Sequence, residues 1–244
     1  MVIRPKIFDQ FPEIIAAQST RLGGTSPEPY GMNLSSHVGD EQTSVDENRE
    51  RFFQVIDVPS GIKAVYQNQV HSANINLVHG EEGVVKESDA LITPDAGVLL
   101  GVTVADCTPI LLYDPVSRLI AAIHAGWRGT EQMIALNVVR QMVEMGAEAK
   151  NIRAFIGACA SKEKYEVGFD VATLFEKKHL TELGNSKFLL DVKGANLDQL
   201  LFAGLLSEHV EVSSLCSISD DRLHSYRRDG KRSGRMLAVI MRRA

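Results

Sequence analysis

Two apolar runs joined by a short turn lie in the middle of the chain and constrain its fold more than any other segment. Residues 109–113 (PILLY) and 119–123 (LIAAI) are apolar, and residues 114–118 (DPVSR) between them are of turn-forming types. Runs of this length on either side of a turn are typical of paired strands. The segment therefore predicts a β-hairpin of two buried strands.

The open end of this hairpin carries reactive side chains. If Tyr113 pairs with Leu119 across the turn, antiparallel pairing continues until Thr108 lies opposite His124. The thiol of Cys107 and the imidazole of His124 are then expected to be neighbours. The hairpin thus predicts that a soft metal ligand and a borderline one meet at one place.

The rest of the chain alternates short apolar runs with amphipathic segments. A capping box of Ser44 and Glu47 and the pair of Asn196 and Gln199 indicate helix starts, and Gly146 indicates a helix end. Strands are expected at residues 14–19, 62–67, 88–94, 98–104, 152–156, 210–216 and 236–241, and helices at 45–57, 131–145, 171–183 and from about 196. This mixed order predicts an α+β fold.

The composition limits the class of protein. With 244 residues, 44% of them hydrophobic, and no linker or low-complexity segment, we expect one domain over residues 1–244. The net charge of −5 argues against a nucleic-acid-binding protein, which needs clustered Lys and Arg. We find no signal sequence and no apolar run of about eighteen residues. Because Cys107, Cys159 and Cys216 cannot all pair, we expect reduced thiols in a cytoplasmic protein without membrane contact.

Cys107, His124 and His71 form a candidate metal-binding set, because zinc accepts both thiolate and imidazole ligands. A catalytic zinc site has three protein ligands and leaves a fourth position open. Two other interpretations fit the same residues. Cys107 activated by His124 would be the nucleophile of a cysteine hydrolase, such as an amidase acting on cell-wall precursor peptides. In a non-catalytic protein, the thiol would be buried and the histidines structural.

Positively charged side chains are available for an anionic substrate. The candidates are Arg49, Arg128 and Arg227, and a loop rich in Gly and Pro adds Arg21 and His37. The sequence contains no GxGxxG dinucleotide loop, no GxxxxGK[ST] phosphate loop and no signature of the zinc cytidine-type deaminases. These enzyme classes are therefore excluded.

A series of short motifs, in order along nearly the whole chain, resembles the bacterial laccase-domain family. Its members are also called polyphenol oxidases or purine nucleoside phosphorylase family proteins. The motifs are STRLGG (19–24), NL (33–34), HVGD (37–40), ENR (47–49), QVH (69–71), TVADC (103–107), HAGWRG (124–129), YEVG (165–168) and SYRRDG (225–230). The ADC and HAGWRG motifs are the most specific of them.

The resemblance implies a single-domain, mostly monomeric chain with αββα layers of mixed sheets, similar to the catalytic domain of cytotoxic necrotizing factor toxins. It also implies that His71, Cys107 and His124 bind zinc, with copper as the alternative metal. The chain departs from the family pattern at Ala158, where a proline is usual, and at His224, where a phenylalanine is usual. We expect His224 to place a polar group near the pocket.

The resemblance further implies phosphorolysis of adenosine, inosine and S-methyl-5′-thioadenosine to a free base and a sugar 1-phosphate, together with deamination of adenosine to inosine. Copper-dependent polyphenol oxidation is discounted, because the chain has seven histidines and no His-x-His pair. For deamination, zinc makes water acidic enough to supply hydroxide, and Asp106 is the candidate to move the proton.

Phosphorolysis additionally requires a site for phosphate and contacts to the sugar. The candidates are Arg49 and then Arg227 for the phosphate, and Asn33 and Gln69 for the sugar hydroxyls. Trp127 and Tyr226 are candidates to stack on the base, although core packing would explain either residue equally well. The expected partners are therefore purine nucleosides and phosphate.

Overall fold

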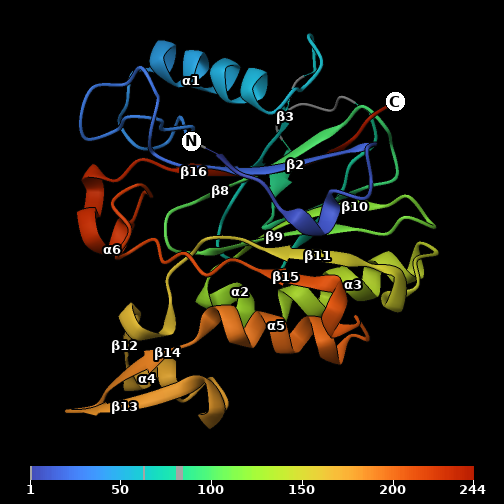
Figure 1. Ribbon diagram of the computed structural model, residues 1–244. Helices are drawn as coiled ribbons and strands as arrows, with labels where there is room; N and C mark the ends of the chain where they lie inside the picture. Colours follow the sequence, from blue (N-terminus) through green and yellow to red (C-terminus); the bar gives the residue numbers. More distant parts are fainter. Residues whose placement is uncertain (1, 63, 81–84) are drawn as a thin grey trace.

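The computed structural model describes residues 2–62, 64–80 and 85–244, whose helices and strands form four layers (Figure 1). Helix α1 (Gln42–Val55) covers the outer face of a five-stranded sheet. That sheet packs on a six-stranded sheet, and α3 (Ile134–Glu144) and α5 (Val192–Phe202) cover the other face of the second sheet. This order of layers confirms the predicted α+β class and the αββα arrangement.

The six-stranded sheet has the order β15-β11-β9-β10-β7-β5. Its strands are β5 (Ile75–Leu77), β7 (Ala90–Thr93), β9 (Thr108–Tyr113), β10 (Ile120–Ala125), β11 (Arg153–Ile156) and β15 (Val210–Val212). The central strands β9 and β10 are buried along their whole length. Burial on both faces explains why their sequences are continuous apolar runs rather than alternating ones.

The five-stranded sheet has the order β1-β2-β16-β8-β3. Its strands are β1 (Val2–Ile3), β2 (Ile14–Ser19), β3 (Ala64–Val65), β8 (Leu99–Val104) and β16 (Met236–Arg242). The predicted strands over residues 14–19, 98–104 and 236–241 are confirmed to within one residue. Strand β8 leads directly into β9 of the other sheet, so the chain crosses between the sheets at residues 105–107.

Apolar layers hold these elements together. Leu111 and Tyr113 from one sheet and Ile240 from the other are buried between the two sheets. On the other side, α3 packs Val138 and Met142 onto the six-stranded sheet, as its amphipathic pattern predicts. These apolar core side chains are therefore separate from the polar side chains of the cavity described below.

The central hairpin is present, but its register differs by one residue from the prediction. Tyr113 pairs with Ile120 rather than with Leu119. Asp114 is the cause, because its backbone N–H donates to the carbonyl of Leu119 (3.0 Å) and its carboxylate accepts the backbone N–H of Val116 (3.0 Å). Leu119 thereby belongs to the turn, and strand pairing begins one residue later.

The observed register determines the face on which Cys107 lies. Pro109 is opposite His124, where the prediction had placed Thr108. Since successive residues of a strand point to opposite faces, Cys107, two residues before Pro109, is on the side of His124. The predicted register would have directed Cys107 to the other face.

A small sheet and a short helix project below the two main sheets (Figure 1). The sheet consists of β12 (Glu166–Gly168), β13 (Leu180–Gly184) and β14 (Lys187–Leu190), and α4 (Phe169–Ala172) packs beside it. The predicted helix over residues 171–183 is therefore wrong. Gly184 and Asn185 have positive φ angles of 85° and 52°, which are typical of a hairpin turn and not of a helix end followed by a loop.

Two predicted helix starts are also wrong. Helix α1 begins at Gln42, so Ser44 lies inside the helix and forms no capping box. Helix α5 begins after Asp191, whose carboxylate accepts the backbone N–H of Gly194 (2.8 Å), and Asn196 lies within the helix. An aspartate at the N-cap satisfies a free N–H in the same way as the predicted asparagine would.

The predicted helix over residues 131–145 consists of two helices. Helix α2 (Trp127–Glu131) ends before Met133, which has a left-handed backbone with φ of 64°, and α3 follows. The end of α3 before Gly146 agrees with the prediction, and this glycine has φ of 103°. A further short helix, α6 (Tyr226–Asp229), lies in the SYRRDG motif.

Two predicted strands are shorter or divided. The segment 62–67 contributes β3 to one sheet, and β4 (Gln67–Asn68) pairs with β6 (Val85–Glu87) apart from it; Lys63 lies outside the described residues. The segment 210–216 ends as β15 at Val212, after which a single bridge joins Cys216 to Cys159. Among the described helices, none combines the length and the apolar character needed to cross a lipid bilayer.

Candidate metal centre

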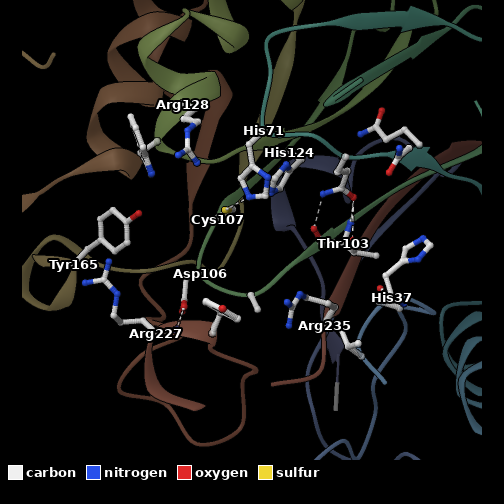
Figure 2. A pocket seen from close by; sticks show the side chains of 18 residues that line it. His37, His71, Thr103, Asp106, Cys107, His124, Arg128, Tyr165, Arg227 and Arg235 are labelled. Carbon is white, nitrogen blue, oxygen red and sulfur yellow. Dashed lines mark hydrogen bonds between the residues drawn. The ribbon is translucent and has the colours of Figure 1, made fainter. Parts of the chain in front are cut away.

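An open cavity of about 540 Å³ lies where the chain crosses from β8 to β9 (Figure 2). Such a volume is in the range of sites for small organic ligands. Most of the residues that line it are polar or charged. The lining residues are Ser35, His37, Val38, Gln67, Asn68, Gln69, His71, Thr103, Ala105, Asp106, Cys107, His124, Trp127, Arg128, Tyr165, Tyr226, Arg227 and Arg235.

His71, Cys107 and His124 meet on one side of this cavity (Figure 2). The ligand atoms of the three residues all lie within 4.8 Å of one another, and Sγ of Cys107 is 3.9 Å from Nε2 of His71. The two imidazole rings are nearly perpendicular, at 84°. In the part of the chain that the structure describes, this is the one group of three such side chains close enough to hold a metal ion.

Each of these three side chains comes from a different element. His124 lies in β10 and is 3% exposed, whereas His71 lies in the loop after β4. Cys107 follows Asp106 in the crossing between the sheets. His71 and Asp106 have positive φ angles of 59° and 86°. Such left-handed backbone costs about 1–3 kcal/mol per residue and concentrates at functional sites.

Asp89, which the sequence analysis did not single out, holds two of the three side chains in place. Its carboxylate is buried, and Oδ1 accepts hydrogen bonds from Nδ1 of His124 (2.7 Å) and from the backbone N–H of His71 (3.0 Å). The other oxygen accepts the backbone N–H and the hydroxyl of Ser72 (2.6 and 2.8 Å). Because Nδ1 of His124 is engaged, Nε2 is the nitrogen available to a metal.

Charge interactions within the group shift its pKa values. Burial acts to raise the pKa of the Cys107 thiol, but His124 and His71 lower it to about 6. Burial acts to lower the pKa of His124, but Cys107 and Asp89 raise it to about 9. Burial likewise acts to raise the pKa of Asp89, which the bond with His124 brings below its ordinary value. Both shifts favour the ion pair of thiolate and imidazolium over the neutral pair in the metal-free protein, and metal binding at His124 requires its Nε2 to be deprotonated.

Two glycines allow the backbone after β10 to approach this group closely. A Cβ atom at Gly126 would lie 3.1 Å from both Sγ of Cys107 and Cδ2 of His71. A Cβ atom at Gly129 would lie 2.7 Å from the backbone oxygen of Ser72, next to His71. The spacing of glycines in the HAGWRG motif thus follows from the contact between two loops.

Asp106 lines the cavity and links the crossing segment to its surroundings. Its two carboxylate oxygens accept hydrogen bonds from the hydroxyl of Ser217 and from the backbone N–H of Arg227, both at 2.6 Å. Its backbone oxygen accepts the N–H of Ala160 (2.9 Å). These contacts fix the turn that presents Cys107 to the two histidines.

Arg128, Arg227 and Arg235, here called the cavity arginines, line the wall of the cavity. Each lies over an aromatic ring, with the charged carbon 4.5 Å from the ring centre of Trp127, 4.8 Å from that of Tyr165 and 5.5 Å from that of Tyr226, respectively. Within the described residues, none of the three is in ion-pair distance of a carboxylate. A wall with three such cations suits an anionic ligand.

Of the two predicted sugar-binding residues, one lines the cavity and the other does not. Gln69 lines the cavity, but its amide is occupied, donating to the carbonyl of Thr103 and accepting the backbone N–H of Thr103, both at 2.8 Å. Asn33 is completely buried and lies outside the described lining. Its amide donates to the carbonyl of Ser35 (2.9 Å) and accepts the backbone N–H of Arg235 (2.9 Å).

Arg49, the first candidate for phosphate, lies on α1 and is not among the described residues that line the cavity. Its guanidinium donates to the carbonyl of Leu34 (3.1 Å), lies 3.6 Å from the carboxylate of Asp46 and is stacked over Tyr66 at 4.7 Å. These contacts hold the loop that precedes α1 onto the helix. Arg227, the second candidate, is the one that reaches the cavity.

Asp89, Tyr165 and Arg235 belong to the site although the sequence analysis gave them no role there. Asp89 directly precedes the apolar residues 90–93, and a carboxylate at the start of a buried strand needs hydrogen-bond donors, which is a usable signal. Arg235 likewise directly precedes a buried strand, β16, so its charge at that position is the same kind of signal. Tyr165 had only its place in the YEVG motif as a signal.

The two departures from the family pattern have separate structural consequences. The backbone N–H of Ala158 donates to Oε1 of Gln18 (2.8 Å), a bond that a proline could not make. His224 is completely buried and does not belong to the described lining, so it adds no polar group to the cavity wall itself. Among the described residues neither ring nitrogen of His224 has a hydrogen-bond partner, and burial lowers its pKa to about 3.

The fold and the site together define a four-layered α+β protein with a candidate metal centre of two histidines and one cysteine in an open cavity. A family model described as multi-copper polyphenol oxidoreductase laccase matches residues 15–243. The chain therefore belongs to this family, which confirms the resemblance to laccase-domain proteins.

Similar proteins extend over nearly the whole chain. A purine nucleoside phosphorylase of Deinococcus radiodurans is 41% identical over 228 residues, covering 92% of this chain and 87% of that protein. A purine nucleoside phosphorylase of Corynebacterium glutamicum is 36% identical over 229 residues, covering 91% and 92%. The crystal structure of YlmD from Geobacillus stearothermophilus has a TM-score of 0.88 at 35% identity, covering 96% of this chain and 93% of that one. The structure of the hypothetical protein YfiH from Bacillus licheniformis has a TM-score of 0.90 at 29% identity, covering 97% and 94%.

Proposed function

We propose that this protein is a metal-dependent purine nucleoside phosphorylase. It would cleave adenosine, inosine and S-methyl-5′-thioadenosine with phosphate, giving the free base and a sugar 1-phosphate. The observation that carries the proposal is one cavity that contains both the Cys-His-His group and the cavity arginines. The names of the similar proteins from Deinococcus radiodurans and Corynebacterium glutamicum supply the substrate class.

The donor set suits zinc, and copper is the alternative. One thiolate and two imidazoles are three ligands of a kind that catalytic zinc sites use, with a fourth position left for substrate or water. Asp89 supports this assignment, because a metal-binding histidine usually donates its other N–H to a carboxylate. When bound, the ion would supply a Lewis acid. A multinuclear copper centre would need ligand groups beyond the one that the described residues offer.

In phosphorolysis, an oxygen of phosphate forms a bond to C1′ of the sugar while the bond from C1′ to the base breaks, and the base leaves with the electron pair. Phosphate must therefore be held beside the sugar. We assign this role to Arg227, assisted by Arg128, because both line the cavity whereas Arg49 does not. We keep Gln69 as the candidate for a sugar hydroxyl and assign Asn33 a positioning role beneath the cavity wall.

Deamination of adenosine to inosine is the second activity that we propose for this cavity. Water adds to C6 of the purine and ammonia leaves, so one proton has to move from the water to the leaving nitrogen. Asp106 is the candidate to carry it, because its carboxylate lines the cavity next to Cys107. Trp127 and Tyr226 also line the cavity and are candidates to stack on the base.

We further propose that residues 1–244 act as a single domain and a monomer in the cytoplasm, with small molecules rather than nucleic acid or membrane as partners. The negative formal charge of −5 and the common apolar layers that join both sheets support this organisation. Chromatography with light scattering at several protein concentrations would test the monomer.

The test of the activity is incubation of zinc-loaded protein with adenosine or inosine and phosphate, followed by chromatography of the products. We expect free base and sugar 1-phosphate, with loss of both after chelation and in Cys107→Ala. Arg227→Gln should raise KM for phosphate about 10-fold to 100-fold, since a hydrogen bond to a charged group contributes about 1.5–3 kcal/mol. Arg49→Gln is the matched control and should leave this KM unchanged. No base release by the zinc-loaded wild type would overturn the proposal.

One observation favours a second candidate, a cysteine hydrolase. His124 lies between Cys107 and Asp89, which is the order of groups that activates a cysteine nucleophile, and the thiol pKa is lowered to about 6. An amidase acting on cell-wall precursor peptides is the substrate class that we would assay. Its activity would survive chelation and disappear on alkylation of Cys107, whereas the phosphorylase would lose activity in both cases.

A further inference from the structure

Cys159 and Cys216 lie outside the candidate metal centre and have no role in the proposed function. They are the two residues of a single parallel β-bridge, in which Ser217 N–H donates to the carbonyl of Cys159 (2.9 Å). Paired residues of adjacent strands are separated by about 4.8 Å. This spacing is within the range of about 4.4–6.8 Å that Cα atoms joined by a disulfide have. Bridge partners also extend to the same face, so the two side chains are neighbours.

The two thiols have different surroundings. Cys159 is completely buried, and burial raises its pKa to about 11. Cys216 is partly exposed, and its sulfur accepts the backbone N–H of Ser161 (3.4 Å). Burial acts to raise the pKa of Cys216, but hydrogen bonds from Ser161 and Ser219 lower it to about 7. An exposed thiol that ionises easily reacts with oxidants first, and a buried neighbour is placed to resolve the product.

We propose that Cys159 and Cys216 form a reversible oxidation site that hydrogen peroxide converts into a disulfide. The thiolate sulfur of Cys216 attacks peroxide, the O–O bond breaks, and a sulfenic acid and hydroxide form. The sulfur of Cys159 then displaces the hydroxyl group from Cys216, a sulfur–sulfur bond forms, and the thiol proton leaves with the hydroxyl as water. Two thiols are oxidised and one peroxide is reduced to water. A dithiol reductant reverses the reaction.

The pair lies behind the wall of the cavity. Ala160, next to Cys159, and Ser217, next to Cys216, are both hydrogen-bond donors to Asp106. A disulfide would thus join the two segments that hold the crossing between the sheets. In metal-loaded protein the thiolate of Cys107 would be occupied as a ligand, which leaves Cys216 as the partly exposed free thiol.

Trypsin separates the three cysteines, which makes a direct test available. Cleavage after Lys and Arg leaves Cys107 in peptide 87–118, Cys159 in peptide 154–162 and Cys216 in peptide 194–222. Folded, zinc-loaded protein is treated with equimolar hydrogen peroxide, alkylated and digested without reductant. We expect peptides 154–162 and 194–222 to be joined, and to separate after dithiothreitol. A link from peptide 87–118 to either of them, or no link at all after complete oxidation of Cys216, would overturn the proposal.

Two variants test the order of the steps. In Cys159→Ser no resolving thiol is present, so the sulfenic acid of Cys216 should accumulate and react with dimedone. In Cys216→Ser neither a disulfide nor a dimedone adduct on peptide 154–162 should form. Both variants should bind one zinc ion per chain like the wild type, which shows that they are folded. A dimedone adduct on Cys159 in Cys216→Ser would contradict the assignment of Cys216 as the first site of attack. Because peptide mapping measures no turnover, the result does not depend on the proposed catalytic activity.

Discussion

Replacing Asp89 with asparagine tests whether one buried carboxylate assembles the candidate metal centre. The wild-type carboxylate accepts Nδ1 of His124, the N–H of His71, and the N–H and hydroxyl of Ser72, all within 3.0 Å. Asparagine has nearly the same volume, but one of its two groups is an NH2 donor. The carboxylate also accepts the N–H of Val70 (3.3 Å), so at whichever oxygen position the NH2 group lies, two N–H donors would face it.

The magnitude follows from these contacts. An unsatisfied buried donor costs about 1–3 kcal/mol, so two of them lower the free energy of unfolding by about 2–6 kcal/mol. Loss of the carboxylate partner of a metal-binding histidine lowers metal affinity about 10-fold to 100-fold. A smaller effect opposes this, since Asp89 helps to raise the pKa of His124 and its removal makes the imidazole easier to deprotonate. We therefore expect a zinc affinity about tenfold lower for Asp89→Asn near neutral pH.

Competition with a chromophoric chelator measures the zinc affinity, and urea unfolding followed by circular dichroism measures the stability. Asp114→Asn is the matched control, because Asp114 is also buried and also accepts a backbone N–H and a serine hydroxyl in a turn, at the far end of the same hairpin. This control should lose stability but keep its zinc affinity. A zinc affinity of folded Asp89→Asn within twofold of wild type would refute the reasoning.

Three further outcomes are expected. In metal-free protein, alkylation of Cys107, followed on peptide 87–118, should be half-maximal near pH 6 and be blocked by zinc; a midpoint above pH 8 would contradict the thiolate. Gly129→Ala should weaken zinc binding about tenfold in the chelator assay, because its Cβ would lie 2.7 Å from the backbone oxygen of Ser72 and displace the loop beside it. His224 has a pKa of about 3 in the folded protein, below its ordinary value of 6.5. Between pH 6.5 and pH 3 the unfolded chain therefore binds a proton at this imidazole and the folded protein does not, so the stability of the wild type falls as the pH falls. Between pH 7 and pH 5 the wild type should lose about 2 kcal/mol more stability in urea than His224→Phe does, and equal losses would refute this.

Much of the fold can be predicted from apolar runs, because burial on one or both faces of a sheet dictates them. Residues 109–113 and 119–123 are an example, and their pairing differs from the prediction only by the extra turn residue that Asp114 holds. Helical spacing of apolar residues and capping motifs predict the helices of this chain less well than apolar runs predict its strands. Residues 171–183 have helical spacing of apolar side chains, yet 180–184 form a strand, because the left-handed turn at Gly184 pairs it with β14. Tertiary pairing overrode the local pattern there.

The candidate site could be predicted in part. Cys107, His124 and the QVH motif with His71 carry residue types with obvious ligand chemistry, and the structure brings them together. Asp89 is of a residue type that is usually exposed, and its place directly before a buried strand is the only sequence signal of the buried, hydrogen-bonded role that the structure shows. Arg49 has the charge that a phosphate site needs, but its guanidinium binds the carbonyl of Leu34 and does not line the cavity. Sequence therefore indicates which chemistry is available, whereas the directions of side chains depend on tertiary packing.

The position of the site follows from the way the two sheets are connected. Strands β8 and β9 belong to different sheets, so the chain must cross between them, and the left-handed backbone of Asp106 makes that crossing short. Cys107 lies in this crossing. Asp89 directly precedes β7 of the six-stranded sheet, and it holds both histidines in place by hydrogen bonds. The thiol and the imidazoles are thus held by two independent sets of hydrogen bonds, one from Ser217 to Asp106 and one from His124 to Asp89. A ligand that binds all three side chains would join strand ends of both sheets, and the open cavity lies at these strand ends, outside the apolar layer between the sheets.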